Sequence, residues 1–261
     1  LEQRRTELLD PRLPRFGDLR GALDHLRLRY RRWADDLCRD FSRVCEEQGF
    51  LAGEGLQQRT LFEEVVRPLA NNEGTVVLFL VDAFRYEMAE ALCSELKGEP
   101  GTRVDLRPRL SELPSITAVG MNALAPVADG GRLRPVFRKG QIQGFSTGEF
   151  QVCDWNSRQK VMHSRVGGDT CPRLSLDDVL ARDPGSLCRT LARTRLLLVH
   201  SLAVDDMGEG GVGLATFDLT LRQLRHAWSL LRGAGARRFV FTADHGFLLL
   251  DDSVGKPITL G

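Results

Sequence analysis

Three aspartates and one histidine of this 261-residue sequence have the residue types and positions that could hold divalent metal ions. Each aspartate ends a run of aliphatic and β-branched residues: Asp82 after 75–81, Asp205 after 195–204, and Asp244 after 238–243, with His245 next in the chain. Carboxylates brought close together raise each other's pKa, and a bound cation removes that repulsion. Oxygen and imidazole ligands together suit zinc, with manganese, iron or magnesium as alternatives. We therefore predict a metal site at these residues.

A further carboxylate, Glu209, lies four residues after Asp205. On a helical turn the two side chains would point to the same side and could share a second cation. Glycines on both sides of Glu209 weaken a regular helix there, and Asp206 is the alternative ligand. The competing interpretation is that each aspartate is only a helix N-cap or a turn residue. Three such aspartates, one of them in an Asp-His-Gly sequence, favour the metal site.

A candidate nucleophile lies in the segment 113–117, just before a helix that we predict from about 117 to 124. A hydroxyl at a helix start meets free N–H groups that favour a phosphate, and beside a metal ion it can attack phosphorus at neutral pH. Ser115 and Thr117 are both candidates, and an ordinary helix cap is the competing interpretation. Arg85, close after Asp82, could clamp a phosphate or pair with Glu87.

The elements that must position these residues form an α/β pattern. The three apolar runs are typical of central strands of a parallel sheet, buried on both faces. Helical patterns follow the first run through Lys97 and occupy 214–232 between the second and third runs. This alternation predicts a mainly parallel sheet with helices on both faces. Ligands of such sheets bind beyond the carboxyl ends of the strands, where the aspartates would meet.

The sequence before this pattern differs from it. Apolar residues at spacings of three and four predict one long amphipathic helix, and they are Leu19, Leu23, Leu26, Tyr30, Trp33, Leu37, Phe41 and Val44. We therefore expect a helical N-terminal segment over 1–72 and an α/β domain over 73–261. A glycine-rich stretch at about 125–193 is expected as a cap-like insertion. Because the sequence lacks an initiator methionine, we expect a segment of a longer protein, truncated at its C-terminus.

Composition narrows the class of protein. The 36 lysines and arginines nearly balance 35 acidic residues, which argues against a nucleic-acid binder that works by bulk electrostatics. No apolar run approaches the roughly 20 residues that span a bilayer, so no membrane partner is expected. The six cysteines contain no Cys-x-x-Cys pair and predict reduced thiols in a cytoplasmic protein. A nucleotide-binding module is disfavoured, since no glycine-rich phosphate motif follows the first strand.

Four motifs, in this order, resemble the PglZ domain family, a branch of the alkaline phosphatase superfamily found in bacteriophage-exclusion (BREX) defence systems. They are Val81-Asp82-Ala83-Phe84-Arg85-Tyr86-Glu87, Leu113-Pro114-Ser115-Ile116-Thr117, Asp205-x-x-Gly208-Glu209 and Thr242-Ala243-Asp244-His245-Gly246. The resemblance implies an alkaline-phosphatase-like α/β fold. It also implies a two-metal phosphohydrolase that acts on a diester, a nucleotide or a nucleic acid, with other defence proteins as partners.

The resemblance also implies roles for individual residues. Asp82, Asp244 and His245 would surround one metal with the nucleophile, while Asp205 and Glu209 would hold the other. Thr117 matches the family's nucleophile, with Ser115 as the second choice. Two departures favour an alternative, a catalytically weak or inactive scaffold subunit of a BREX-type complex. The superfamily usually has histidine where this chain has Glu209, and it usually has a further histidine downstream, whereas this chain has none after residue 245.

Overall fold

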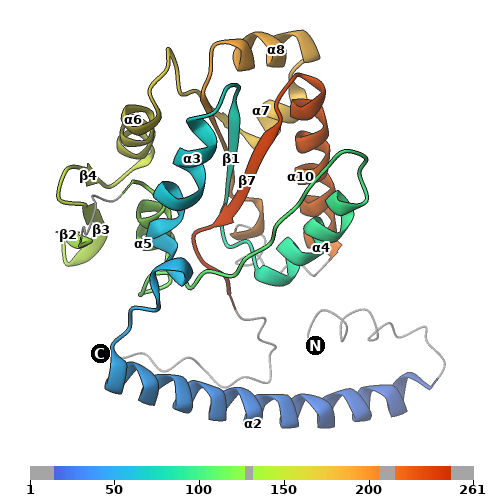
Figure 1. The fold of residues 1–261 in the computed structure, drawn as a ribbon. Coiled ribbons are helices and arrows are strands. Elements are labelled where there is room, and N and C mark those ends of the chain that lie inside the picture. The colour runs from blue at the N-terminus through green and yellow to red at the C-terminus, as the bar shows by residue number, and fades with distance from the viewer. Residues whose placement is uncertain (1–14, 127–131, 206–214, 248–261) are drawn as a thin grey trace. The chain divides into compact units, whose positions relative to one another are not determined.

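The computed structural model describes residues 15–126, 132–205 and 215–247, and the chain divides into two compact units. The smaller unit comprises Leu1–Ala52 with Leu248–Gly261, and the larger comprises Gly53–Phe247. In the smaller unit, helix α2 (Phe16–Gln48) confirms the long amphipathic helix predicted from the apolar spacing (Figure 1). The boundary between the units lies twenty residues earlier than the predicted domain boundary at 72, and Leu61, Phe62, Val66 and Ala70 share the buried cluster of the larger unit's sheet.

A four-stranded parallel sheet forms the centre of the larger unit, in the order β5-β6-β1-β7. Its strands are β5 (Arg173–Ser175), β6 (Leu196–Ser201), β1 (Val76–Val81) and β7 (Arg238–Ala243). Every residue of β1 is buried, as expected of a strand with neighbours on both edges and helices on both faces. The three strands predicted from the apolar runs are confirmed, and together with the helices they form the expected α/β fold.

Helices cover both faces of this sheet (Figure 1). On one face, Val76, Leu78 and Leu80 of β1 share a buried cluster with side chains of four short or medium helices. These are η3 (Phe62–Val66), α3 (Arg67–Ala70), α5 (Thr117–Ala123) and α6 (Trp155–Val166). On the other face, Trp228 of α10 (Ala215–Gly233) packs on Phe239 of β7 with ring centroids 6.0 Å apart. Contacts with α10 hold α4 (Tyr86–Lys97), α7 (Leu176–Ala181) and α8 (Pro184–Ala192) in place.

The stretch predicted as a single insertion divides between two parts of the fold. Strands β2 (Arg134–Arg138), β3 (Gln141–Ser146) and β4 (Gln151–Val152) form a separate antiparallel sheet. In contrast, β5 joins the central sheet beside β6, and α7 and α8 contact α10, so the end of the predicted insertion belongs to the main α/β layers. Two short 3₁₀ helices, η1 (Glu54–Leu56) and η2 (Gln58–Thr60), begin the larger unit.

Within the described ranges, none of the helices is both long enough and apolar enough to cross a membrane.

Candidate metal and catalytic site

Sheet register brings two of the predicted carboxylates side by side. Val81 of β1 is paired with Ala243 of β7, so Asp82 and Asp244 are the next residues on adjacent parallel strands. Both leave their strands at the same edge, where parallel strands end together. Asp82 is 2 % exposed and Asp244 is fully buried. Two neighbouring carboxylates removed from water are costly unless protons or a cation compensate them.

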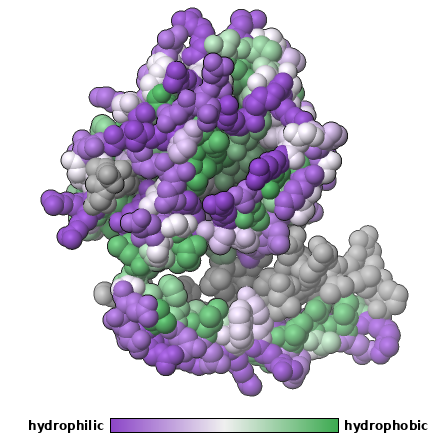
Figure 2. All heavy atoms as spheres, in the orientation of Figure 1, coloured by the Kyte–Doolittle hydropathy of each residue, from purple (hydrophilic) through white to green (hydrophobic). Residues whose placement is uncertain are grey.

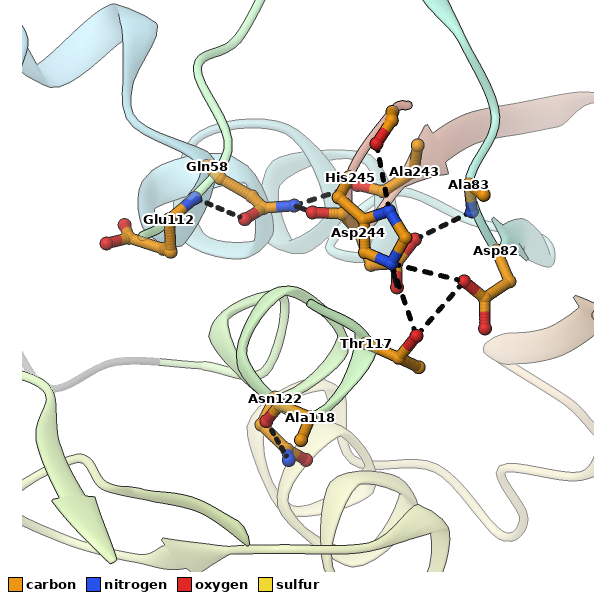
Figure 3. A network of polar contacts seen from close by, with 11 residues as sticks. Gln58, Asp82, Ala83, Glu112, Thr117, Ala118, Asn122, Ala243, Asp244 and His245 are labelled. Atoms are coloured by element: carbon orange, nitrogen blue, oxygen red, sulfur yellow. Dashed lines mark hydrogen bonds and ion pairs between the residues drawn. The ribbon is translucent and has the colours of Figure 1, made fainter. Parts of the chain in front are cut away.

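An imidazole completes this cluster (Figure 3). Nε2 of His245 lies 3.3 Å from Oδ2 of Asp244 and 3.7 Å from Oδ1 of Asp82, and ligand atoms of the three residues all lie within 4.8 Å of one another. Nδ1 of His245 lies 3.1 Å from the carbonyl oxygen of Gly246. A carbonyl only accepts hydrogen bonds, which assigns the proton of the neutral imidazole to Nδ1. The lone pair of Nε2 then faces two carboxylates, an arrangement that a cation between them would stabilise.

The hydroxyl of Thr117 faces the same centre from the first residue of α5. Oγ1 lies 3.4 Å from Oδ1 of Asp82, to which it donates a hydrogen bond, and 3.2 Å from Nε2 of His245. Ser115, the other candidate nucleophile, is exposed in the segment before the helix. The structure therefore brings Thr117 to the carboxylates and the imidazole, and these contacts do not include Ser115.

The electrostatics of the cluster are those of crowded, buried acids. Burial, the neighbouring carboxyl of Asp244 and the negative charge of Asp205 together raise the pKa of Asp82 to about 8, and burial makes the largest contribution. Oδ1 of Asp244 accepts a hydrogen bond of 3.0 Å from the backbone N–H of Ala83. Oδ2 of Asp244 is buried and has no hydrogen-bond partner among the described residues. Such an unpaired carboxylate oxygen, beside a second carboxylate and an imidazole nitrogen, fits a divalent cation.

Three further residues were predicted for this site, and they are Asp205, Glu209 and Arg85. Asp205, four residues past the end of β6, is close enough for its charge to act on Asp82, but it is not part of the three-residue group. Glu209 lies outside the described residues. Arg85 forms an ion pair with Glu87, the contact that the sequence suggested for it, and its guanidinium lies 5.1 Å from the ring centroid of Phe247. Nη1 of Arg85 is buried without a hydrogen-bond partner in the described structure.

Gln58, which the sequence analysis did not single out, links the turn that carries Asp244 and His245 to the segment that leads to Thr117. Its Nε2 donates to the backbone carbonyl of Ala243 at 2.9 Å and to that of Asp244 at 2.6 Å. Its Oε1 accepts from the backbone N–H of Glu112 at 3.0 Å, in the segment that leads to Thr117. Figure 3 shows this side chain between the two loops. Gln58 is only 4 % exposed, so these backbone groups have no ready access to water.

Replacing Gln58 by leucine is expected to lower the free energy of unfolding by about 1–3 kcal/mol, because three buried or partly buried backbone groups lose their partner. Urea unfolding followed by circular dichroism measures this loss. Gln141→Leu is the matched control, since Gln141 is exposed on β3. Equal stability of the two variants would contradict a structural role for the Gln58 amide.

Gly120 lets α5 approach the backbone of the Asp244 turn. A Cβ atom at this position would lie 2.2 Å from the carbonyl oxygen of Asp244 and 2.6 Å from its carbonyl carbon. Neither backbone atom can move without displacing the Asp244 carboxylate. The absence of a side chain at Gly120 thus sets how close Thr117, one turn earlier on α5, comes to the acids.

Gly120→Ala is therefore expected to destabilise the protein by about 1–3 kcal/mol or more, although alanine is the better helix former. Differential scanning calorimetry gives the shift in melting temperature. The matched control is Gly233→Ala in α10, where nothing lies within 4 Å of the added Cβ and a gain of up to about 1 kcal/mol is expected. A Gly120→Ala protein as stable as this control would contradict the close approach of α5 to the backbone of Asp244.

The sequence offered one usable signal for these two residues. An isolated glycine inside a helical pattern, as at 120, often marks close packing. A single glutamine after the predicted N-terminal helix carries no such signal, because the partners of Gln58 lie more than fifty residues away in the chain.

Comparison with known proteins gives a family match over most of the chain. Residues 61–257 match the model of the BREX system PglZ alkaline phosphatase-like domain. Two curated relatives are similar to this chain. The alkaline phosphatase-like protein BrxZ of Escherichia coli O9:H4 (strain HS) is 32 % identical over 115 residues, which are 41 % of this chain and 13 % of the relative. The alkaline phosphatase-like protein PglZ of Bacillus cereus (strain H3081.97) is 22 % identical over 215 residues, which are 80 % of this chain and 24 % of the relative.

Proposed function

Because the chain belongs to the family of BREX system PglZ alkaline phosphatase-like domains, we propose that it is a metal-dependent phosphohydrolase acting in bacterial defence against phage. The observation that carries the proposal is the hydroxyl of Thr117, which faces the two buried carboxylates and the imidazole nitrogen of the cluster. The chain spans a quarter or less of the two relatives, so its proposed partners include other parts of a longer defence protein and other BREX proteins.

The donor atoms present fit a divalent metal ion, with zinc as our first choice and manganese or magnesium as alternatives. Asp82, Asp244 and His245 would hold it, and Oδ2 of Asp244 has no other partner among the described residues. When bound, the ion would neutralise the clustered carboxylates, lower the pKa of a nearby hydroxyl and stabilise negative charge on a phosphate. Asp205 and Glu209 are proposed to hold a second ion.

The chemistry proposed for the chain's own residues begins at Thr117. Its Oγ1 attacks phosphorus, a bond from Oγ1 to phosphorus forms, and the bond from phosphorus to the leaving oxygen breaks. The proton of Oγ1 has an acceptor in Oδ1 of Asp82, to which it already donates. Water then hydrolyses the phosphothreonine and restores the hydroxyl. The unpartnered Nη1 of Arg85 is proposed to bind a phosphate oxygen of the substrate.

Hydrolysis of bis(4-nitrophenyl) phosphate by the purified chain tests this function. Activity is expected with zinc, to be lost after treatment with a chelator and to return when zinc is restored. A preference for diesters over 4-nitrophenyl phosphate is expected from the family resemblance. Absence of turnover with zinc, manganese and magnesium alike would contradict the proposal and favour the scaffold alternative.

A further inference from the structure

Helix α2 carries an apolar stripe that faces solvent. Six large side chains of the stripe are 39–56 % exposed: Leu26, Tyr30, Trp33, Leu37, Phe41 and Val44. In Figure 2, hydrophobic side chains lie along one side of α2 and hydrophilic ones along the other. A continuous exposed stripe of this kind on a long helix is typical of a surface that a partner covers.

The spacing of the stripe indicates that its partner is another helix. From Leu23 to Leu37 the apolar residues alternate at intervals of three and four, a mean repeat of 3.5 residues. This repeat keeps the apolar side chains on a seam along which two helices can supercoil. A helix that packs on a sheet or on an irregular surface needs no such strict alternation.

Charge along α2 indicates the direction of that partner. The first half, 16–32, has five arginines and two aspartates, and the second half, 33–48, has two arginines and five acidic residues. The halves thus carry net charges of +3 and −3, the reverse of the order that a helix dipole favours. A second copy lying antiparallel would place each positive half against a negative half, whereas a parallel copy would pair like with like.

We infer that α2 pairs with the α2 helix of a second copy of this chain as a two-fold symmetric, antiparallel coiled coil. Overlaying the helix on itself in the opposite direction, about the point midway between Tyr30 and Trp33, brings three pairs of apolar positions opposite each other, the outermost being Leu19 with the partner's Val44, whereas Leu23 lies opposite the partner's Asp40. Tyr30 then lies opposite the partner's Trp33, and Leu26 lies opposite the partner's Leu37. By symmetry each contact occurs twice.

This register also brings a positive and a negative side chain together at the edge of the seam. Arg29 precedes the seam residue Tyr30, and Asp36 precedes the seam residue Leu37, so both flank the seam on the same side. In the antiparallel pair, Arg29 faces the partner's Asp36, and the reciprocal contact is identical. In a parallel pair, Arg29 would face the partner's Ala34 and Asp36 would face the partner's Phe41, so that no ion pair would form. The side chain of Asp36, which pairs with Arg39 of its own helix, is 65 % exposed and accessible to a partner.

Charge reversal within the full 261-residue chain tests this arrangement. Sedimentation equilibrium is expected to show a dimer at micromolar concentrations. Arg29→Asp and Asp36→Arg, each alone, place like charges in both symmetric contacts and are expected to weaken dimerisation by about tenfold. The variant with both changes restores opposite charges and is expected to recover the dimer. Arg31→Asp is the matched control, because position 31 lies away from the seam.

Two further measurements make the outcome decisive. Trp33→Glu, which puts charges at the centre of the seam, is expected to yield a monomer with an unchanged melting transition of the α/β unit. A wild-type chain that is monomeric would overturn the inference. Single reversals without effect, or a double variant that stays dissociated, would overturn the antiparallel register.

Discussion

Thr117→Ala is expected to lower the rate of hydrolysis of bis(4-nitrophenyl) phosphate by about 10³-fold or more, because it removes the proposed nucleophile. Oγ1 of Thr117 lies 3.4 Å from Asp82 and 3.2 Å from His245, and removing this single half-buried hydroxyl leaves the proposed metal ligands in place. The variant is therefore expected to keep its zinc-dependent rise in melting temperature. Loss of activity with retained zinc binding separates a chemical role from a structural one.

Ser115→Ala is the matched control for this experiment. Ser115 is exposed and lies two residues before Thr117, so its replacement is expected to leave the rate unchanged. Turnover that survives Thr117→Ala would contradict the proposed mechanism. Loss of turnover in the Ser115 variant instead would assign the nucleophile to Ser115. Trapping of a phosphorylated enzyme, followed by peptide mass spectrometry, identifies the residue directly.

Zinc is expected to stabilise the protein strongly at pH 8, and Asp82→Asn is expected to abolish this effect. At a zinc concentration of 100 times Kd, the stabilisation is about 2.7 kcal/mol, which corresponds to a rise in melting temperature of roughly 5–10 °C for a protein of this size. Asp82 and Asp244 lie side by side with His245, so removing one carboxylate removes a ligand. Asp169→Asn, at an exposed position, is the control and should keep the full effect.

The metal-free protein is expected to show a matching dependence on pH. The pKa of Asp82 is raised from 3.8 to about 8 in the folded state, so the folded protein binds a proton more tightly than the unfolded chain. The resulting stabilisation is complete below about pH 4 and is lost as the pH rises towards 8. Without metal at pH 8, Asp82→Asn should therefore melt at a higher temperature than the wild type. If pH and zinc change the melting temperatures of the variant and the wild type equally, Asp82 is not part of the metal site.

The proposed dimer and the proposed hydrolytic site lie in different units of the chain. Helix α2 belongs to the unit that includes Leu1–Ala52, while Thr117 and the carboxylates belong to Gly53–Phe247. The charge-reversal variants and the site variants can therefore be measured independently. If dimerisation affects the rate of hydrolysis, the change will appear in the Arg29 and Asp36 variants, whose active-site residues are untouched.

The central strands and their aspartates were predictable because local sequence carries the signal for both. Continuous apolar runs favour buried parallel strands, which end at one edge and so predict that their terminal aspartates meet; the pairing of β1 with β7 then placed Asp82 beside Asp244. Strand β5 was missed because Arg173–Ser175 is too short for any periodicity to show. The boundary near residue 53 was missed because the side chains of Phe62 and Val66 are buried by strands distant in sequence.

By itself, then, the sequence determined the α/β fold, the long helix α2 and the meeting of carboxylates with His245 at one sheet edge. Only the tertiary structure placed the hydroxyl of Thr117 against the acids, directed the lone pair of His245 towards them, and placed Gln58 and Gly120 as supports. The reason is physical. Burial and strand direction follow from the order of residues along a short segment, whereas these contacts join groups up to 186 residues apart and exist only once the elements have packed.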